Sequence, residues 1–145
     1  MNKKVLEFTV YTKPISISKA YRSVIARRAG RFIPSAVLTS EGKKFKSVVG
    51  RAAFIAMRSA GYSIIEGPFS IVVNYFFDPA AEGDVTNYDK TLIDGMKGIV
   101  FKDDRALGRN KDSAFLDSGI FFEARFRKWF DKSDPRTEIK IIFYE

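Results

Sequence analysis

The chain has 145 residues, of which 46% are hydrophobic, and this size fits one compact domain spanning residues 1–145. It contains no histidine and no cysteine, which excludes Ser-His-Asp and Cys-His nucleophiles, disulfides, and zinc sites built from imidazole or thiolate ligands. Any bound metal must therefore be held by oxygen, which favours magnesium, manganese or calcium. The formal net charge of +8 indicates an anionic partner.

The charge is segregated along the chain. Residues 1–60 carry 13 basic and 2 acidic side chains, whereas residues 61–145 carry 12 basic and 15 acidic ones. Seven of those acids fall between positions 78 and 104. A carboxylate cluster beside a basic segment suits a metal-dependent enzyme that acts on a polyanion, although both regions can also be solvated surface.

No targeting segment is expected. Glu7 interrupts the apolar stretch at the N-terminus, so this stretch does not resemble a signal peptide. No apolar run approaches the roughly 20 residues that a membrane span needs. We expect a soluble, cytoplasmic protein without a membrane partner.

The N-terminal half begins with alternating apolar residues, which predict a strand over Val5–Thr12. Lys13–Leu38 shows no sustained period, so we expect a long functional loop there. Helical spacing of apolar residues follows, with Thr39 or Ser40 as the N-cap and Gly61 as the end of the helix.

The C-terminal half alternates strands and one helix. We predict a strand over Pro68–Phe77, a helix over Val85–Lys97 that stops at Gly98, and strands over Ile99–Phe101, Ile120–Phe126 and Thr137–Tyr144. The last two strands are expected to form an antiparallel hairpin, because Asp134-Pro135 marks a turn between them. The order of elements predicts an α+β fold in which two main helices pack on a mixed β-sheet.

The residues that carry chemistry surround the second helix. Asn87, Lys90 and Asp94 share one side of it, opposite an apolar stripe of Val85, Tyr88, Leu92 and Met96. Asp84 lies at the helix start, where the exposed amides keep its carboxylate ionised. Asp94 is up to roughly 15 Å from Asp84, which makes it the weaker candidate for the same metal ion.

A second acidic pair, Asp103-Asp104, follows the predicted short strand. If that strand runs back from the helix end, the pair approaches Asp84, and magnesium between the carboxylates replaces their repulsion with coordination. Lys90 then neutralises the charge that builds on a phosphate, with Arg105 as a second donor. The alternative is structural, since Asp84 or Thr86 can cap the helix, Asp103-Asp104 can form a turn and Lys90 can be solvated.

The stretch from Asp84 to Lys90 with Asp94, followed by Gly98 to Asp104, resembles the signature of the RusA family of Holliday junction resolvases. The segments Pro14–Ser16, Tyr21-Arg22 and Leu38–Phe45 extend the resemblance toward the N-terminus. Members of this family are small, homodimeric, magnesium-dependent endonucleases that are common in phages and prophages. The resemblance implies a single RusA-like domain.

The resemblance also implies roles for individual residues. Asp84 and Asp104 would ligate the metal, Lys90 would be the catalytic cation, and Asn87 matches a polar position of the active-site motif. Thr86 stands where the family often has a second aspartate, and a hydroxyl is a poorer ligand than a carboxylate, so Asp103 or Glu82 would have to compensate. The basic segment over residues 13–38 would contact DNA, and the predicted DNA-binding residues are Lys19, Tyr21, Arg22, Arg27, Arg28, Arg31, Lys43 and Lys44.

We therefore expect a Mg²⁺-dependent endodeoxyribonuclease, with Mn²⁺ as a second candidate ion, that resolves Holliday junctions and related branched DNA in recombination and repair. A homodimer would place one site on each strand to be nicked. The alternative from another class is a noncatalytic, basic DNA- or RNA-binding module. Cleavage of flaps or unbranched DNA by the same chemistry also stays open.

Overall fold

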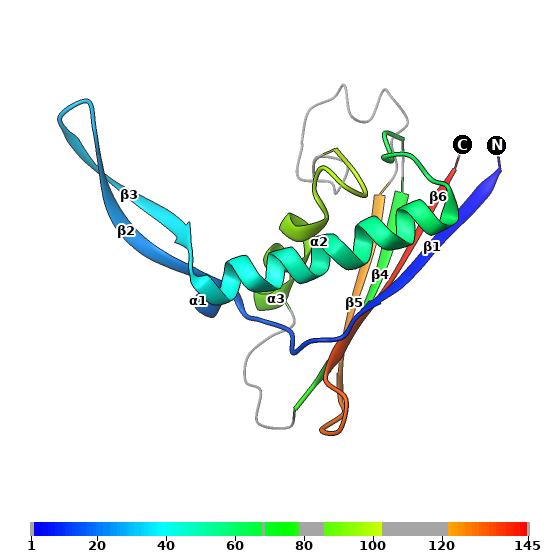
Figure 1. The fold of residues 1–145 in the computed structure, drawn as a ribbon. Coiled ribbons are helices and arrows are strands. Elements are labelled where there is room, and N and C mark those ends of the chain that lie inside the picture. The colour runs from blue at the N-terminus through cyan, green and yellow to red at the C-terminus, as the bar shows by residue number, and fades with distance from the viewer. Residues whose placement is uncertain (1, 68, 79–85, 103–121, 145) are drawn as a thin grey trace.

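The computed structural model describes residues 2–67, 69–78, 86–102 and 122–144. Its elements, in chain order, are β1 (Lys3–Val10), α1 (Ile17–Ala20), β2 (Tyr21–Arg28), β3 (Arg31–Leu38), α2 (Ser40–Ala60), β4 (Phe69–Phe77), α3 (Thr86–Met96), β5 (Phe122–Phe130) and β6 (Arg136–Tyr144). β1, β6, β4 and β5 form a sheet in that order, and β2 and β3 form a separate two-stranded sheet (Figure 1). The predicted α+β fold with a mixed sheet is confirmed.

The central strands of the main sheet are β6 and β4. β6 runs antiparallel to both β1 and β4, whereas β5 pairs with β4 in parallel. The predicted hairpin between the last two strands is therefore wrong, because β4 lies between β5 and β6. The physical reason is that every second residue of β4 is buried, whereas β5 exposes Arg125 and Arg127, as suits an edge strand.

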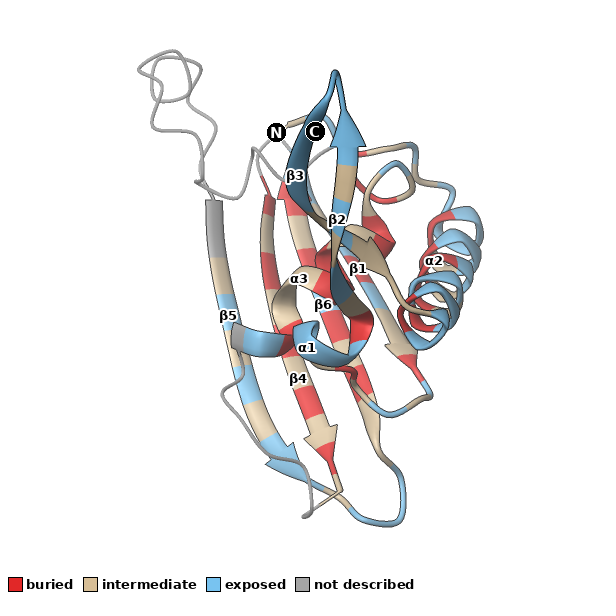
Figure 2. Ribbon diagram, turned by 90° about the vertical axis from the view of Figure 1, so that its left-hand side faces the viewer, coloured by how far each residue is buried: buried red, intermediate tan, exposed pale blue. Residues whose placement is uncertain are grey.

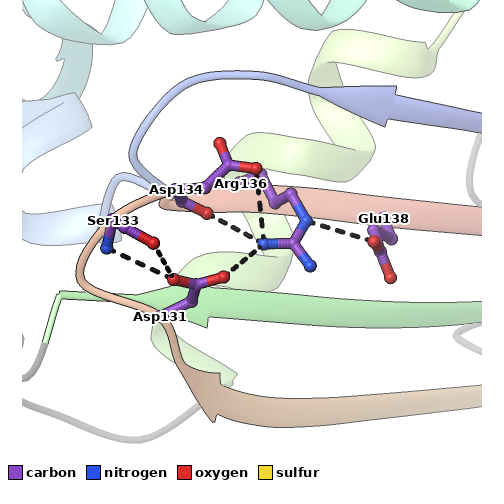
Figure 3. A network of polar contacts seen from close by, with 5 residues as sticks. All are labelled: Asp131, Ser133, Asp134, Arg136 and Glu138. Atoms are coloured by element: carbon purple, nitrogen blue, oxygen red, sulfur yellow. Dashed lines mark hydrogen bonds and ion pairs between the residues drawn. The ribbon is translucent and has the colours of Figure 1, made fainter.

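The connection from β5 to β6 passes the end of β4. Asp131 continues the β4–β5 ladder, since its amide donates to the Phe77 carbonyl at 2.8 Å. Arg136 then holds the connection together by donating to Asp131 at 2.9 Å and to the Asp134 carbonyl at 3.0 Å, while its Nε donates to Glu138 at 3.1 Å (Figure 3). The predicted turn at Asp134 is present, but it joins two strands that are not neighbours.

Both large helices cover the same face of the sheet, and the core lies between them and the strands (Figure 2). β1, β4 and β6 turn alternate residues such as Leu6, Val73 and Ile141 into this core. α3 buries Tyr88, Leu92 and Met96, which confirms the predicted apolar stripe for those three positions.

Local chemistry sets the limits of α2. Thr39 Oγ1 accepts a hydrogen bond from the Gly42 amide at 3.1 Å, and Gly61 closes the helix in the left-handed region with φ 70°. Both predicted ends are confirmed. Among the helices that the structure describes, none combines the length and apolar character needed to cross a bilayer.

Residues 21–38, here called the arm, form a β-hairpin that projects from the body beside α1 (Figure 1). Its register runs from Tyr21 opposite Leu38 to Arg28 opposite Arg31, and Ala29 and Gly30 make a two-residue turn with φ 50° and 74°. The prediction of a long loop over Lys13–Leu38 is thus wrong. Neither face of the arm packs on the core along its length, so its sequence lacks the alternation that marks a half-buried strand.

The chain turns tightly after α3. The amide of Val100 donates to the Met96 carbonyl at 3.0 Å, and the Gly98 amide donates to the Phe101 carbonyl at 2.7 Å. The buried Phe101 ring stacks on Phe69, with centroids 5.1 Å apart. The strand predicted over Ile99–Phe101 is therefore wrong, because these residues form a turn that keeps Phe101 at the C-terminal end of α3.

Candidate active site

The described part of the candidate site is centred on the carboxylate of Asp94 in α3. Lys90 Nζ lies 3.0 Å from Asp94 Oδ2, and Lys97 Nζ lies 3.3 Å from Asp94 Oδ1. Residues three and four positions apart share a helix face, so the three side chains meet on the side of α3 that the apolar stripe leaves free. The exposed fraction is 14% for the Asp94 side chain and 44% for Lys90. The Lys90 ammonium is therefore held by the Asp94 carboxylate and is still open to solvent.

The base of the arm completes this cluster. Tyr21, the first residue of β2, donates its hydroxyl to Asp94 Oδ2 at 2.5 Å. The Lys90 ammonium also lies 5.3 Å from the centroid of the Tyr21 ring, which is within the range of a cation–π interaction. The arm is thus tied to the predicted catalytic lysine through one shared carboxylate.

The cluster keeps Asp94 ionised. Burial by itself raises the pKa of this carboxyl, but the hydrogen bonds from Tyr21 and Lys90 and the charges of Lys90 and Lys97 outweigh burial and bring the pKa below its ordinary value. Burial and the bond to Asp94 raise the pKa of Tyr21, so the phenol stays protonated as a donor. A negative Asp94 is what fixes the positions of the Lys90 and Lys97 ammonium groups.

Asp89 precedes Lys90 but serves a different purpose. Its Oδ1 accepts a hydrogen bond from the hydroxyl of Tyr75 in β4 at 2.9 Å. Burial raises the pKa of Asp89 to about 6, and the Tyr75 hydrogen bond opposes this shift only in part. This carboxylate anchors α3 to the sheet.

The predicted metal ligands are not tested by the described residues. Asp84, Asp103 and Asp104 lie outside them, as do Glu82 and Arg105, and the predicted contribution of Thr86 rests on a residue described only as the first of α3. Among the residues that the structure does describe, no three acidic side chains form a metal-binding group. The metal site stays a prediction.

The turn after α3 also changes how Asp104 would reach Asp84. The eleven residues from Thr86 to Met96 extend about 15 Å along the helix axis. The predicted return strand, which would have covered about 10 Å of this length, is absent from the described residues. Both acids lie outside the described residues, so their convergence on one ion stays a prediction.

The other predicted site residues fall on five elements. Asn87 is exposed in the first turn of α3. Of the predicted DNA-binding residues, Lys19 lies on α1, Tyr21, Arg22, Arg27 and Arg28 on β2, Arg31 on β3, and Lys43 and Lys44 on α2. All of them except Tyr21 are exposed, whereas Tyr21 packs into the Asp94 cluster. The arm thus carries four exposed arginines away from the body.

Sequence reasoning assigned Asp94 no role beyond that of a weaker metal candidate. The structure makes it the partner of Lys90, and the four-residue spacing of the two side chains was the available signal. Its bond to Tyr21 joins residues 73 positions apart, which no local pattern could indicate.

Comparison with known proteins identifies the family of this chain. A search of curated proteins returned no match. A scan against protein-family models matches residues 14–142 to the family described as Endodeoxyribonuclease RusA. The matched span includes the arm, both large helices and the acidic segments, and it confirms the predicted endodeoxyribonuclease activity on Holliday junctions over the noncatalytic alternative. The chain therefore belongs to the RusA family of endodeoxyribonucleases.

Proposed function

We propose that this chain cuts four-way DNA junctions by Mg²⁺-dependent hydrolysis, with Lys90 as the catalytic cation and Asp84 and Asp104 as metal ligands. The observation that carries the proposal is that the Lys90 ammonium is fixed in position and still exposed. Its ammonium is held 3.0 Å from the Asp94 carboxylate, yet almost half of the side chain is exposed. A cation that is fixed at one side and open at the other suits a phosphate that approaches from solvent.

Lys90 would act on the charge that develops during hydrolysis. An ammonium has three N–H donors, and Asp94 accepts one of them. The others are available to a phosphate oxygen, where negative charge builds in the transition state. Tyr21 and Asp94 hold the lysine in place before the substrate arrives, so little reorganisation is needed at the moment of reaction.

The chemistry of the donors supports a hard divalent ion. The chain has no histidine or cysteine, so Asp84 and Asp104, assisted by Asp103 and Thr86, would offer oxygen alone. Mg²⁺ prefers such ligands, and Mn²⁺ accepts them. When bound, the ion would activate a water molecule and shield the phosphate.

The arm supports DNA as the substrate. Residues 8–40 contain six basic and no acidic side chains, and Arg22, Arg27, Arg28 and Arg31 are exposed on the arm. Such a surface would bind along the phosphates of one DNA branch of the junction. A homodimer would present two such hairpins and two sites to the two strands that must be cut.

The test is a cleavage assay on a labelled synthetic four-way junction. We expect wild-type protein to nick the junction with Mg²⁺ or Mn²⁺ and to stop when the ion is chelated. Asp84→Asn should lose cleavage but bind the junction as tightly as wild type or more tightly, because it removes an acid near the phosphates. A structural cap would instead lose cleavage and binding together.

Lys90→Gln tests the catalytic cation. We expect its cleavage rate at saturating protein to fall by about 10²-fold, with binding changed far less. Lys132→Gln is the matched control, since Lys132 is an exposed lysine in the connection between β5 and β6. Tight junction binding without any nicking by the wild type in either ion would favour the noncatalytic module.

A further inference from the structure

A groove of about 510 Å³ lies between α2 and α3, next to the Asp94 cluster. Its walls carry Lys43, Lys46 and Arg51 from α2 and Lys97, the residue that follows α3. None of the roles assigned above uses Lys46 or Arg51. We propose that this groove binds the phosphate backbone of one DNA strand of the junction and guides it toward Lys90. The proposal rests on the proposed function for its ligand, since DNA is the substrate there.

Two glycines that line the groove lie where α2 and the end of α3 approach each other closely. A Cβ atom at Gly95 would lie 2.8 Å from Val49 Cγ1, and one at Gly50 would lie 3.1 Å from Ile99 Cδ1. Both glycines line the groove, and neither has a side chain to fill it. Long cationic side chains of α2 and of Lys97 line the groove beside this close helix contact.

The charge that α2 contributes to the groove is not balanced by the described part of the chain. Lys43, Lys46 and Arg51 are exposed, and none of them has a carboxylate partner among the described residues. The acid closest to the groove along α3 is Asp94, which already binds Tyr21, Lys90 and Lys97. Several like charges around one hollow repel each other, and a polyanion relieves that repulsion.

The groove is continuous with the candidate active site. Lys97 lines the groove and contacts Asp94 Oδ1, while Lys90 contacts Oδ2 of the same carboxylate. The base of the arm adjoins both regions, because Leu38 lines the groove and its strand partner Tyr21 binds Asp94. A strand bound along the groove would therefore present successive phosphates first to Lys97 and then to Lys90.

The test compares two variants that remove equal charge. The first, Lys46→Gln with Arg51→Gln, alters the groove and keeps good helix-forming residues on α2. The control, Lys3→Gln with Lys140→Gln, alters exposed residues on the sheet face that the helices do not cover. Binding to a fluorescent four-way junction is measured by anisotropy without divalent ions, at several salt concentrations between about 50 and 200 mM.

The groove variant should bind at least tenfold more weakly at low salt, and its log-log salt slope should be shallower by about 1.8, since each lost phosphate contact contributes about 0.9. The control should keep the wild-type slope. Equal affinity and slope for both variants would overturn the proposal, including the case in which the groove accepts an acidic protein segment instead of DNA. Thermal unfolding of both variants verifies that each is folded.

Cleavage measured in parallel with Mg²⁺ separates this proposal from the proposed function. If wild-type protein cleaves and the groove variant behaves like the control, the groove proposal fails and the nuclease assignment stands. If wild-type protein binds without cleaving, and the groove variant still loses affinity and slope, the groove is supported and the nuclease assignment fails.

Discussion

Replacing Asp94 by asparagine removes one charge from the cluster that holds Lys90 and keeps a side chain of the same shape. The Tyr21 hydroxyl at 2.5 Å is a charge-assisted donor, worth about 1.5–3 kcal/mol, whereas a neutral bond to asparagine is worth about 0.5–1.5 kcal/mol. The pairs with Lys90 and Lys97 involve lysines that are 44% and 35% exposed, so solvent screening limits each to about 0.5 kcal/mol. We therefore expect Asp94→Asn to lower the free energy of unfolding by about 2 kcal/mol at pH 7.

The pH dependence of this loss has a definite sign. Because the pKa of Asp94 is below its ordinary value of 3.8 in the folded protein, its stabilising effect is complete well above pH 3.8. The effect is lost as the pH falls through the folded-state pKa. The difference between wild type and Asp94→Asn should thus be largest near neutrality and shrink in strong acid.

Urea denaturation followed by far-UV circular dichroism measures the stability, and a double-mutant cycle with Tyr21→Phe isolates the hydrogen bond. We expect a coupling energy of about 1 kcal/mol. Asp134→Asn is the control, since this 55% exposed carboxylate lies 3.6 Å from Arg136 and should contribute less than about 0.5 kcal/mol. Equal losses for both variants, or strictly additive effects of Tyr21→Phe and Asp94→Asn, would refute the argument.

Three further substitutions test other parts of the structure. Asp89→Asn should stabilise the protein by about 2 kcal/mol at pH 8 and by little at pH 4. Because the pKa of Asp89 is raised to about 6 in the folded protein, stability that is present below pH 3.8 is lost as the pH rises through 6 and the carboxylate becomes charged, and asparagine removes that charge. Urea melts at both pH values measure the difference. Gly95→Ala should cost about 1–3 kcal/mol, since its methyl group would collide with Val49 and force the helices apart, and a lower melting temperature reports it. Thr39→Ala should cost about 1 kcal/mol through loss of the α2 cap, while Thr39→Ser should restore most of that stability in the same melt.

Several features of this protein follow from local sequence. Thr39 and Gly61 set the ends of α2 because capping depends on the residues next to the helix terminus. The alternation in β4 and the stripe on α3 were predictable, because each records which face of a single element is buried. The family signature from Asp84 to Lys90 could also be recognised from the sequence, since it is a short run of adjacent positions.

Other features were decided only by tertiary structure. The pairing of β5 with β4, rather than with β6, depends on which strand edges meet, and two strands that are close in sequence do not reveal a third between them. The two strands of the arm could not be predicted, because both faces of the arm are largely exposed and residues 21–38 therefore show no alternation of apolar and polar residues. The bond from Tyr21 to Asp94 forms only when the arm base and α3 have both docked on α2, so a contact across 73 positions leaves no trace in the local pattern of either segment. Caps and burial periods act over a few neighbouring residues and can be predicted from them, whereas strand order and the position of Lys90 arise from distant segments packing together.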